Sequence, residues 1–224
     1  GLVTMVLSGH QPCYLPSLQL FAKIKKSDLF LHCGHLQFEH GSWHNRNYVL
    51  LRGVRYRLTI PIKRPHMVPI RNAWFADQVW KTEHLRTITV AYGKTPFFNV
   101  YYPELKEIIH SHPGSLERLN IELSNKLADW LGVTTPMVDG GKFHFSGDAV
   151  EMIIQMCHEV GADTYLSNEG SAAYLGMAEE ERLQRGGVKH EWLNFKDPCP
   201  DGAEPLSVVH HLFHLGPEAA RLIE

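Results

Sequence analysis

Apolar and polar positions near the start of the chain predict a strand, a helix and a second strand. Val3 to Leu7 is a nearly continuous apolar run, which is typical of a strand buried on both faces of a parallel sheet. Pro16 stands where proline is best tolerated, at the first position of a helix. Asp28 to His32 reads as a second buried strand, which completes a β-α-β unit. Between the strands, helical spacing places Leu18, Phe21, Ala22 and Lys25 on the inward face and leaves Lys23 and Lys26 in solvent.

The middle of the chain predicts a β-hairpin followed by a block of helices. Asn47 to Leu51 and Arg55 to Ile62 have strand-like composition and flank the turn Arg52-Gly53. Pro61 and Pro65 then close the second strand. Helices are predicted at residues 79–93 after the cap Asp77, at Phe97 to His110, and at Leu116 to Leu131 after the cap Ser115.

The strand and helix alternation resumes in the last third of the chain. Strands are predicted at Thr135 to Val138, Thr164 to Ser167 and Val188 to Phe195, a helix between the cap Ser146 and Gly161, and closing helices at Ser207 to His214 and Glu218 to Ile223. In the first closing helix, His210, His211 and His214 are expected on a solvated or interfacial face. The elements together predict one α/β domain over residues 1–224, with a mostly parallel Rossmann-like sheet, an inserted β-hairpin and a helical subregion at residues 77–131.

Composition narrows the class of protein. The 224 residues are 44% hydrophobic and carry a formal net charge of −2, with both signs interspersed and no basic stripe, so duplex DNA is not an expected partner. No apolar run reaches the ~18 residues of a membrane span and no leader pattern opens the chain, so we expect a cytoplasmic protein. The four cysteines, Cys13, Cys33, Cys157 and Cys199, are scattered without a C-x-x-C pair, which predicts free thiols.

The loop after the first strand is the leading candidate for a functional site. Gly9, His10, Gln11, Cys13 and Tyr14 crowd into a short segment that prolines stiffen, just before a helix N-terminus. A purely structural turn is the alternative. In open α/β sheets, ligands bind beyond the carboxyl ends of the strands, beside such helix starts.

Other segments supply candidate substrate-binding residues. Ser167, Asn168 and Glu169 form a second strand-to-helix junction, which we expect to face the same crevice, although a plain capping turn is the alternative. The polar segment from His35 to Arg46 reads as a binding loop. The candidate substrate-binding residues within this loop and just after it are Gln37, Asn45, Arg46, Asn47 and Lys63. Arg46 could bind a phosphate or carboxylate, or it could form a surface ion pair instead.

Several motifs resemble the WbqC-like protein family across nearly the whole chain. They are Gly9-His10-Gln11-Pro12-Cys13-Tyr14-Leu15-Pro16, Ser27-Asp28, Gln37-Phe38, Asn45-Arg46-Asn47, Leu58-Thr59-Ile60-Pro61-Ile62-Lys63, Lys94-Thr95-Pro96-Phe97-Phe98, Gly161-Ala162-Asp163-Thr164-Tyr165-Leu166-Ser167 and Gly216-Pro217-Glu218. The family is associated with bacterial polysaccharide and natural-product clusters. The resemblance implies attachment of an amino acid, glycine in particular, to an amino group.

Two departures from the family pattern bear on that implication. Where the family usually reads Leu-Asp-Asp-Val-Gln-Phe, this chain has Gly34 and His35 in place of the two acidic residues, and Cys13 replaces a small polar residue. A weaker resemblance is to nucleotidyltransferases and pantothenate synthetases. It equates His10 with their first loop histidine and Ser167 to Ser171 with a later turn around an adenylate, but their second loop histidine is missing.

The implied reaction assigns a role to each residue of the first loop. In aminoacyl transfer to an amine, His10 suits the base, and Gln11 with the loop amides suits the oxyanion. Tyr14 either donates to the leaving group or packs beneath it, and Cys13 is either a nucleophile or a small buried side chain. The expected acceptor is a small-molecule amine on a sugar or natural product, and the acyl donor is an aminoacyl-tRNA or an adenylate made from ATP.

Two other functions remain open from the sequence. His32, His35, His40 and His44 have spacing that resembles metal ligands, which would suit a metal-dependent hydrolase, but no recognised histidine signature accompanies them. Loss of the acidic pair would also suit a non-catalytic protein that binds a small molecule.

Overall fold

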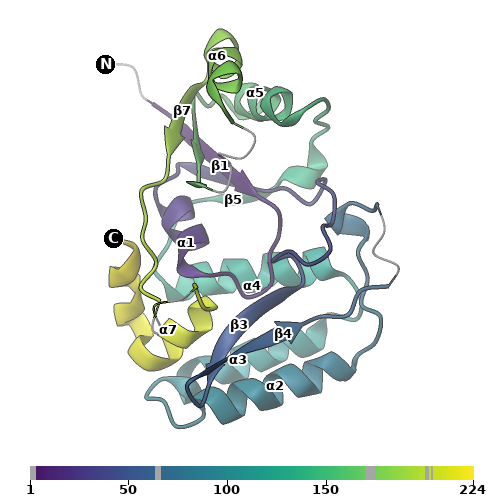
Figure 1. Cartoon of the computed structure of the whole chain (residues 1–224), viewed down its shortest axis with the longest axis vertical. Helices are drawn as coiled ribbons and strands as arrows, with labels where there is room; N and C mark the ends of the chain where they lie inside the picture. Colours follow the sequence, from purple (N-terminus) through teal and green to yellow (C-terminus); the bar gives the residue numbers. More distant parts are fainter. Residues whose placement is uncertain (1–3, 64–66, 170–174, 200–201, 203) are drawn as a thin grey trace.

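The computed structural model describes residues 4–63, 67–169, 175–199, 202 and 204–224 (Figure 1). The predictions that fall on Val3, Pro65 and Ser171 lie outside the described residues. The predicted α/β class is confirmed, with a parallel five-stranded sheet, a separate antiparallel hairpin and helices around them. Among the described helices, none combines the length and the apolar character that crossing a bilayer requires.

The central sheet has the strand order β5-β2-β1-β6-β7, and all its pairings are parallel. The strands are β1 (Val6–His10), β2 (Leu29–His32), β5 (Met137–Asp139), β6 (Thr164–Ser167) and β7 (Lys189–Trp192). Numbered one to five along the chain, they run in the order 3-2-1-4-5, so the direction of winding reverses between β1 and β6. A sheet of this kind opens a crevice at that reversal. The first strand begins later than predicted, which makes His10 its last residue.

Two apolar layers cover the sheet. On one side, Leu7 and Leu31 pack with residues of α5 (Ala149–Val160) and α6 (Met177–Arg185). On the other side, the larger core joins α1 (Leu18–Lys25) to the hairpin, the helical block, α7 (Val208–Leu215) and the closing 3-10 helix η4 (Gly216–Ile223). Helix α6 was not predicted, and α5 is capped by Asp148 rather than Ser146, because the Asp148 carboxylate accepts the Glu151 amide.

The hairpin and three helices form the lower half of Figure 1. They are β3 (Arg46–Leu51), β4 (Val54–Thr59), α2 (Val79–Tyr92), α3 (Phe98–Ser111) and α4 (Leu116–Trp130), with short 3-10 turns η1 (Ile70–Asn72) and η2 (Gly140–Lys142) elsewhere. The hairpin turn is confirmed, since Arg52 and Gly53 have φ of 51° and 79°, the left-handed pair that a tight two-residue turn needs. The predicted cap is confirmed as well, because the Ser115 hydroxyl accepts the Arg118 amide.

Two predictions about exposure are wrong. Lys23 is buried and Lys25 is exposed, because α1 is enclosed between the sheet, α7 and η4 and buries more than one face. His210 and His211 are also buried, since α7 packs against α2 and α3. The Nδ1 atom of His210 lies 3.1 Å from the Tyr92 hydroxyl, inside the core rather than on a solvated face.

Candidate functional site

A cleft of about 860 Å³ lies at the carboxyl edge of the sheet, where the winding reverses. Strands β1 and β6 pair only at Val6–Thr164 and Leu7–Tyr165, and beyond these pairs the two strands part. Residues from both predicted junctions line the cleft, including His10 from the first and Asn168 from the second. The expectation that the two junctions share one crevice is therefore confirmed.

Lys23 fills the gap between the parted strands. Its Nζ atom donates to the Gly9 carbonyl at 3.2 Å and to the Asn168 Oδ1 atom at 3.3 Å. Burial lowers the pKa of the Lys23 ammonium to about 8, and no carboxylate of the described residues lies within ion-pair distance of it. A buried cation without a counter-charge is costly to the fold, so its position on the cleft wall indicates an anionic ligand or an anionic transition state.

Sequence reasoning missed Lys23, although a signal was present. Helix α1 is only eight residues long, and its apolar residues point in more directions than one stripe allows. A helix that is apolar nearly all round is buried nearly all round. A lysine in its middle must then enter the interior, whatever face a helical wheel assigns to it.

His10 is held in one tautomer. Its Nδ1 atom lies 2.9 Å from the Gln11 carbonyl, which can only accept, so Nδ1 carries the hydrogen and Nε2 keeps a lone pair. Nε2 has no hydrogen-bond partner among the described residues. Burial, and then the Lys23 charge, lower the pKa of His10 to about 3, so its ring is neutral at physiological pH. Gln11 lies beside it on the cleft wall, half-buried.

Cys13 borders the cleft as a protonated thiol. Its Sγ atom donates to the Gln11 carbonyl at 3.3 Å and lies 3.6 Å from His10 Nδ1. Burial raises the pKa of the Cys13 thiol to about 12, which opposes the thiolate that a nucleophile requires. The geometry therefore favours the small buried side chain over the nucleophile. Cys33 and Cys157, like Cys13, are buried free thiols.

Tyr14 does not reach the cleft, so the predicted catalytic role is not supported. Its side chain is fully buried, and its hydroxyl lies 2.9 Å from His84 Nδ1. The ring meets Trp80 edge-on at 6.0 Å. The next residue, Leu15, has φ of 42°, a conformation that non-glycine residues rarely adopt, and this turn sends Tyr14 into the core.

Asn47 ties the unusual turn to the hairpin instead of binding substrate. Its Nδ2 atom donates to the Tyr14 and Leu15 carbonyls at 3.3 and 2.9 Å, and its Oδ1 atom accepts the Tyr48 amide at 2.7 Å. With these bonds the side chain has little capacity left for a ligand, although it borders the cleft. Asn120 supports the same loop by donating to the Pro12 carbonyl at 3.2 Å.

Replacing Asn47 with alanine is expected to lower the free energy of unfolding by about 2–3 kcal/mol, because buried carbonyls lose their donor. Urea unfolding followed by fluorescence measures the change. Asn72, which is exposed, provides the control, and its alanine variant should change the free energy by less than about 0.5 kcal/mol. An equally small effect at Asn47 would contradict the assigned role.

Most of the remaining predicted binding residues lie away from the cleft. Asn45 is buried and donates to the Ile60 carbonyl at 2.8 Å, so it is structural. Four others do not line the cleft. Three of these are exposed, namely Gln37, Lys63 and Glu169, and the fourth, Arg46, is half-buried. Ser167 does line it, and its hydroxyl lies 2.8 Å from His190 Nε2, a histidine that the sequence did not single out.

The histidines considered as metal ligands do not converge. His32 Nε2 lies 3.1 Å from Asn125 Oδ1, and His44 Nδ1 accepts the Glu39 amide. His40 is exposed on the loop. Across the described ranges, no three His, Cys, Asp or Glu side chains form a group that could hold a metal ion. The arrangement therefore gives no support to the histidine-based hydrolase.

A carboxylate from another element occupies the place of one missing acidic residue. A Cβ atom built on Gly34 would lie 1.6 Å from Glu117 Oε2, so the side chain of Glu117, from α4, fills that space. Burial, and then the Asp139 charge, raise the pKa of the Glu117 carboxyl. Glycine at position 34 leaves room for the end of the Glu117 side chain, which would have to move aside for a larger residue. A carboxyl group can therefore lie there without an aspartate in the loop.

Comparisons with known proteins agree with the motifs. The chain is 24% identical over 220 residues to the uncharacterized protein Rv1507c of Mycobacterium tuberculosis, a match that covers 93% of each chain. No solved structure matches the chain significantly. The model of the WbqC-like protein family matches residues 11–222, which include most of the first loop and the second junction. The chain therefore belongs to the WbqC-like protein family.

Proposed function

We propose that this protein is a transferase that forms an amide, moving an activated amino acid, glycyl or similar, onto an amine of a sugar or natural-product intermediate. One observation carries the proposal. The cleft places Lys23, a cation that none of the described carboxylates neutralises, close to His10, a histidine with a lone pair on Nε2. Acyl transfer to an amine uses such a pair, a positive group for the oxyanion and an acceptor for the amine hydrogen.

Lys23 acts on the donor in this scheme. Its ammonium neutralises the charge that develops on the acyl oxygen, or the phosphate of an acyl adenylate, in a cleft where little water screens it. The side-chain amide of Gln11, which also lines the cleft, supplies a second donor. Because the ammonium is already bonded to the Gly9 carbonyl and Asn168, it needs little reorganisation when the ligand arrives.

His10 acts on the acceptor. Nε2 accepts a hydrogen bond from the amine and draws its proton away as the nitrogen–carbon bond forms, when that nitrogen becomes strongly acidic. The pKa of about 3 keeps Nε2 unprotonated at neutral pH but makes His10 a weaker base than an ordinary histidine, so it takes the proton only as the nitrogen–carbon bond forms and that nitrogen is most acidic. The leaving oxygen of the donor then takes up a proton.

The donor is proposed to be an aminoacyl adenylate, made from ATP, or an aminoacyl-tRNA. The strand order 3-2-1-4-5 and the histidine at the carboxyl end of the first strand support a sheet of the nucleotidyltransferase type, in which an adenylate would lie across β1 and β6. An aminoacyl-tRNA would place only its CCA end in the cleft, which agrees with the absence of a strong positive charge on the chain.

The test is amide formation from labelled glycine. Purified protein is supplied either with ATP and glycine or with glycyl-tRNA, together with a set of amino sugars, and the product is detected by mass spectrometry. The His10→Gln variant is expected to be slower by about 10²–10⁴-fold, with unchanged thermal stability. His110→Gln, at an exposed position on α3, is the control. Unaltered turnover in His10→Gln would refute the role of His10.

A non-catalytic binding protein is the second candidate. The same observation favours it, because a buried lysine on a cleft wall also captures an anion without any reaction. Binding of AMP without amide formation from either donor would favour this alternative over the transferase.

A further inference from the structure

Three side chains on consecutive elements form a linear hydrogen-bonded relay at the edge of the cleft. The Ser167 hydroxyl, at the end of β6, lies 2.8 Å from His190 Nε2 on β7. The other ring nitrogen, Nδ1, lies 2.5 Å from Glu180 Oε1 on α6. Hydroxyl, imidazole and carboxylate thus follow in the order of a nucleophile, a base and an orienting group.

The chemistry of the partners fixes where the hydrogens lie. An ionised carboxylate only accepts, so Nδ1 of a neutral His190 donates to Glu180 and Nε2 is left with a lone pair. Nε2 then accepts the hydroxyl hydrogen of Ser167. The His190 side chain is 1% exposed and meets the Trp192 ring edge-on at 4.6 Å, so the ring has little freedom to turn away.

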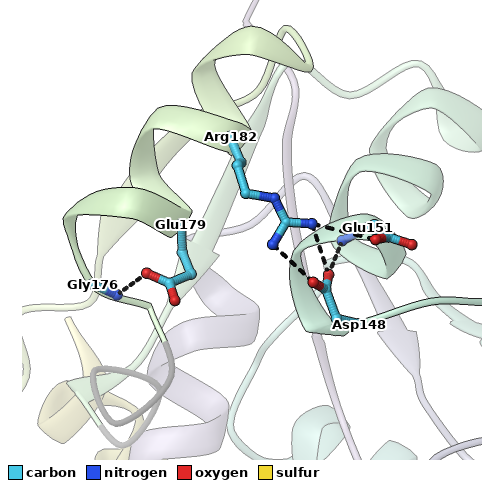
Figure 2. Close-up of polar contacts among 5 residues, drawn as sticks. All are labelled: Asp148, Glu151, Gly176, Glu179 and Arg182. Atoms are coloured by element: carbon cyan, nitrogen blue, oxygen red, sulfur yellow. Dashed lines mark hydrogen bonds and ion pairs between the residues drawn. The ribbon is translucent and has the colours of Figure 1, made fainter.

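The helix that carries Glu180 is tied to α5. Arg182, two residues after Glu180, donates to Asp148, the N-cap of α5, at 2.8 and 3.1 Å and to Glu151 on α5 at 3.4 Å (Figure 2). At the start of α6, the Glu179 carboxylate accepts the Gly176 amide at 3.1 Å. The Arg182 contacts hold the helix against α5 and the Glu179 contact fixes its first turn, which together keep the Glu180 carboxylate in place beside His190.

Ser167 lines the same cleft as Lys23. The serine is the last residue of β6, and the side chain of the next residue, Asn168, accepts a hydrogen bond from Lys23 Nζ. A nucleophile and a cation that could balance an oxyanion therefore belong to neighbouring positions of one cleft wall.

We propose that Ser167 is a covalent nucleophile, activated by His190 and oriented by Glu180, that takes the acyl group from the donor before the amine does. This rests on the proposed transferase function. Ser167 Oγ bonds to the acyl carbon while its proton passes to His190 Nε2, and the donor's carbon–oxygen bond breaks as the leaving oxygen takes that proton. The amine nitrogen then bonds to the acyl carbon and gives one proton to His10 Nε2, which releases it to solvent, while the Oγ–carbon bond breaks and Oγ takes up a proton from solvent through His190.

The test uses a fluorophosphonate carrying a fluorophore, which needs neither donor nor acceptor. Serine attack forms an Oγ–phosphorus bond, fluoride leaves, and the proton passes to His190. We expect labelling of the full chain at the peptide that contains Ser167, and none in Ser167→Ala. His190→Gln should slow labelling by about 100-fold or more and Glu180→Gln by about 10-fold or more, without loss of the cooperative thermal transition.

Ser17→Ala is the matched control, because Ser17 lines the same cleft without a histidine bonded to it, and its labelling should equal that of the wild type. If Ser167→Ala does not fold, Ser167→Cys replaces it, with the modified residue identified by mass spectrometry. An unlabelled wild type, or equal labelling in His190→Gln, would overturn the proposal. Labelling at Ser167 in a protein that forms no amide would support the nucleophile and refute the transferase function. Amide formation by Ser167→Ala at the wild-type rate would support the transferase function and refute the nucleophile.

Discussion

Replacing Lys23 with methionine is expected to abolish anion binding in the cleft while making the protein more stable. The folded state holds the Lys23 pKa at about 8 instead of 10.5, so below pH 8 it bears the full cost of a buried charge. That difference in pKa corresponds to about 3 kcal/mol of stability gained when the charge is removed. The gain is reduced because the variant also loses the two long hydrogen bonds of Lys23. We therefore expect the free energy of unfolding at pH 7 to rise by about 1–3 kcal/mol.

AMP is a suitable anionic probe for the binding half of this prediction. Its affinity for the wild type should fall by at least 100-fold in Lys23→Met, and should decline in the wild type above pH 8 as the ammonium loses its proton. Lys25→Met, on the exposed side of α1, is the control and should change neither quantity. A less stable Lys23→Met variant that still binds AMP would show that the lysine is structural.

Acid should unfold this protein well above the pH at which carboxylates titrate. His10 has its pKa lowered to about 3, and His44, His84 and His211 to about 4, by burial in each case. The unfolded chain binds protons at these positions from about pH 6.5 downward, whereas the fold does not. Stability is therefore full above pH 6.5 and is lost as the pH falls towards 4, by about 1.4 kcal/mol per pH unit for each histidine.

His84 provides the sharpest test of this acid effect. Its Nε2 atom donates to the Thr59 carbonyl at 3.0 Å, so its Nδ1 atom accepts the hydrogen bond from the Tyr14 hydroxyl. Protonation would add a hydrogen to Nδ1 that faces the hydroxyl hydrogen of Tyr14. Urea unfolding at several pH values gives the slope of free energy against pH. His84→Gln keeps a donor and an acceptor without titrating, and should reduce that slope by about 1.4 kcal/mol per pH unit between pH 6 and 4.

An exposed histidine provides the control for the prediction that buried histidines destabilise the fold in acid. His110→Gln should leave the slope unchanged, because the His110 side chain is exposed on α3 and is not packed into the core. If both variants have the wild-type slope, the acid sensitivity of the fold has another origin.

Local sequence patterns predicted most elements of the fold because their causes are local. The Arg52-Gly53 turn, the Ser115 cap and the stop at Gly161 with φ of 75° each depend on a few adjacent residues, and each is present. Helix α6 was missed because most of its residues are charged and its buried side chain is that of Leu183. It therefore has no apolar stripe that a sequence pattern could detect. What holds it is the packing of Leu183 against apolar residues of α5, together with the Arg182 contact with Asp148, and no local pattern reveals either of these.

The candidate site was only partly predictable. The first loop and the second junction meet as expected, because the carboxyl ends of parallel strands share an edge. The expected roles of Tyr14, Asn45 and Asn47 do not fit their surroundings, since these polar side chains satisfy buried groups of the backbone or the core. Residue type alone cannot distinguish an amide that binds a ligand from one that supports a turn.

The sequence by itself determined the order of the strands and of every α-helix except α6, the family and the bend that follows the first strand. Only the tertiary structure decided which charged and polar groups share the cleft. Lys23 and Asn168 lie 145 positions apart in the chain and meet because two strands separate at the reversal of winding. Ser167, His190 and Glu180 form a relay because a helix and a strand return to the same edge. Such contacts depend on long-range packing and on burial, and no short stretch of sequence encodes them.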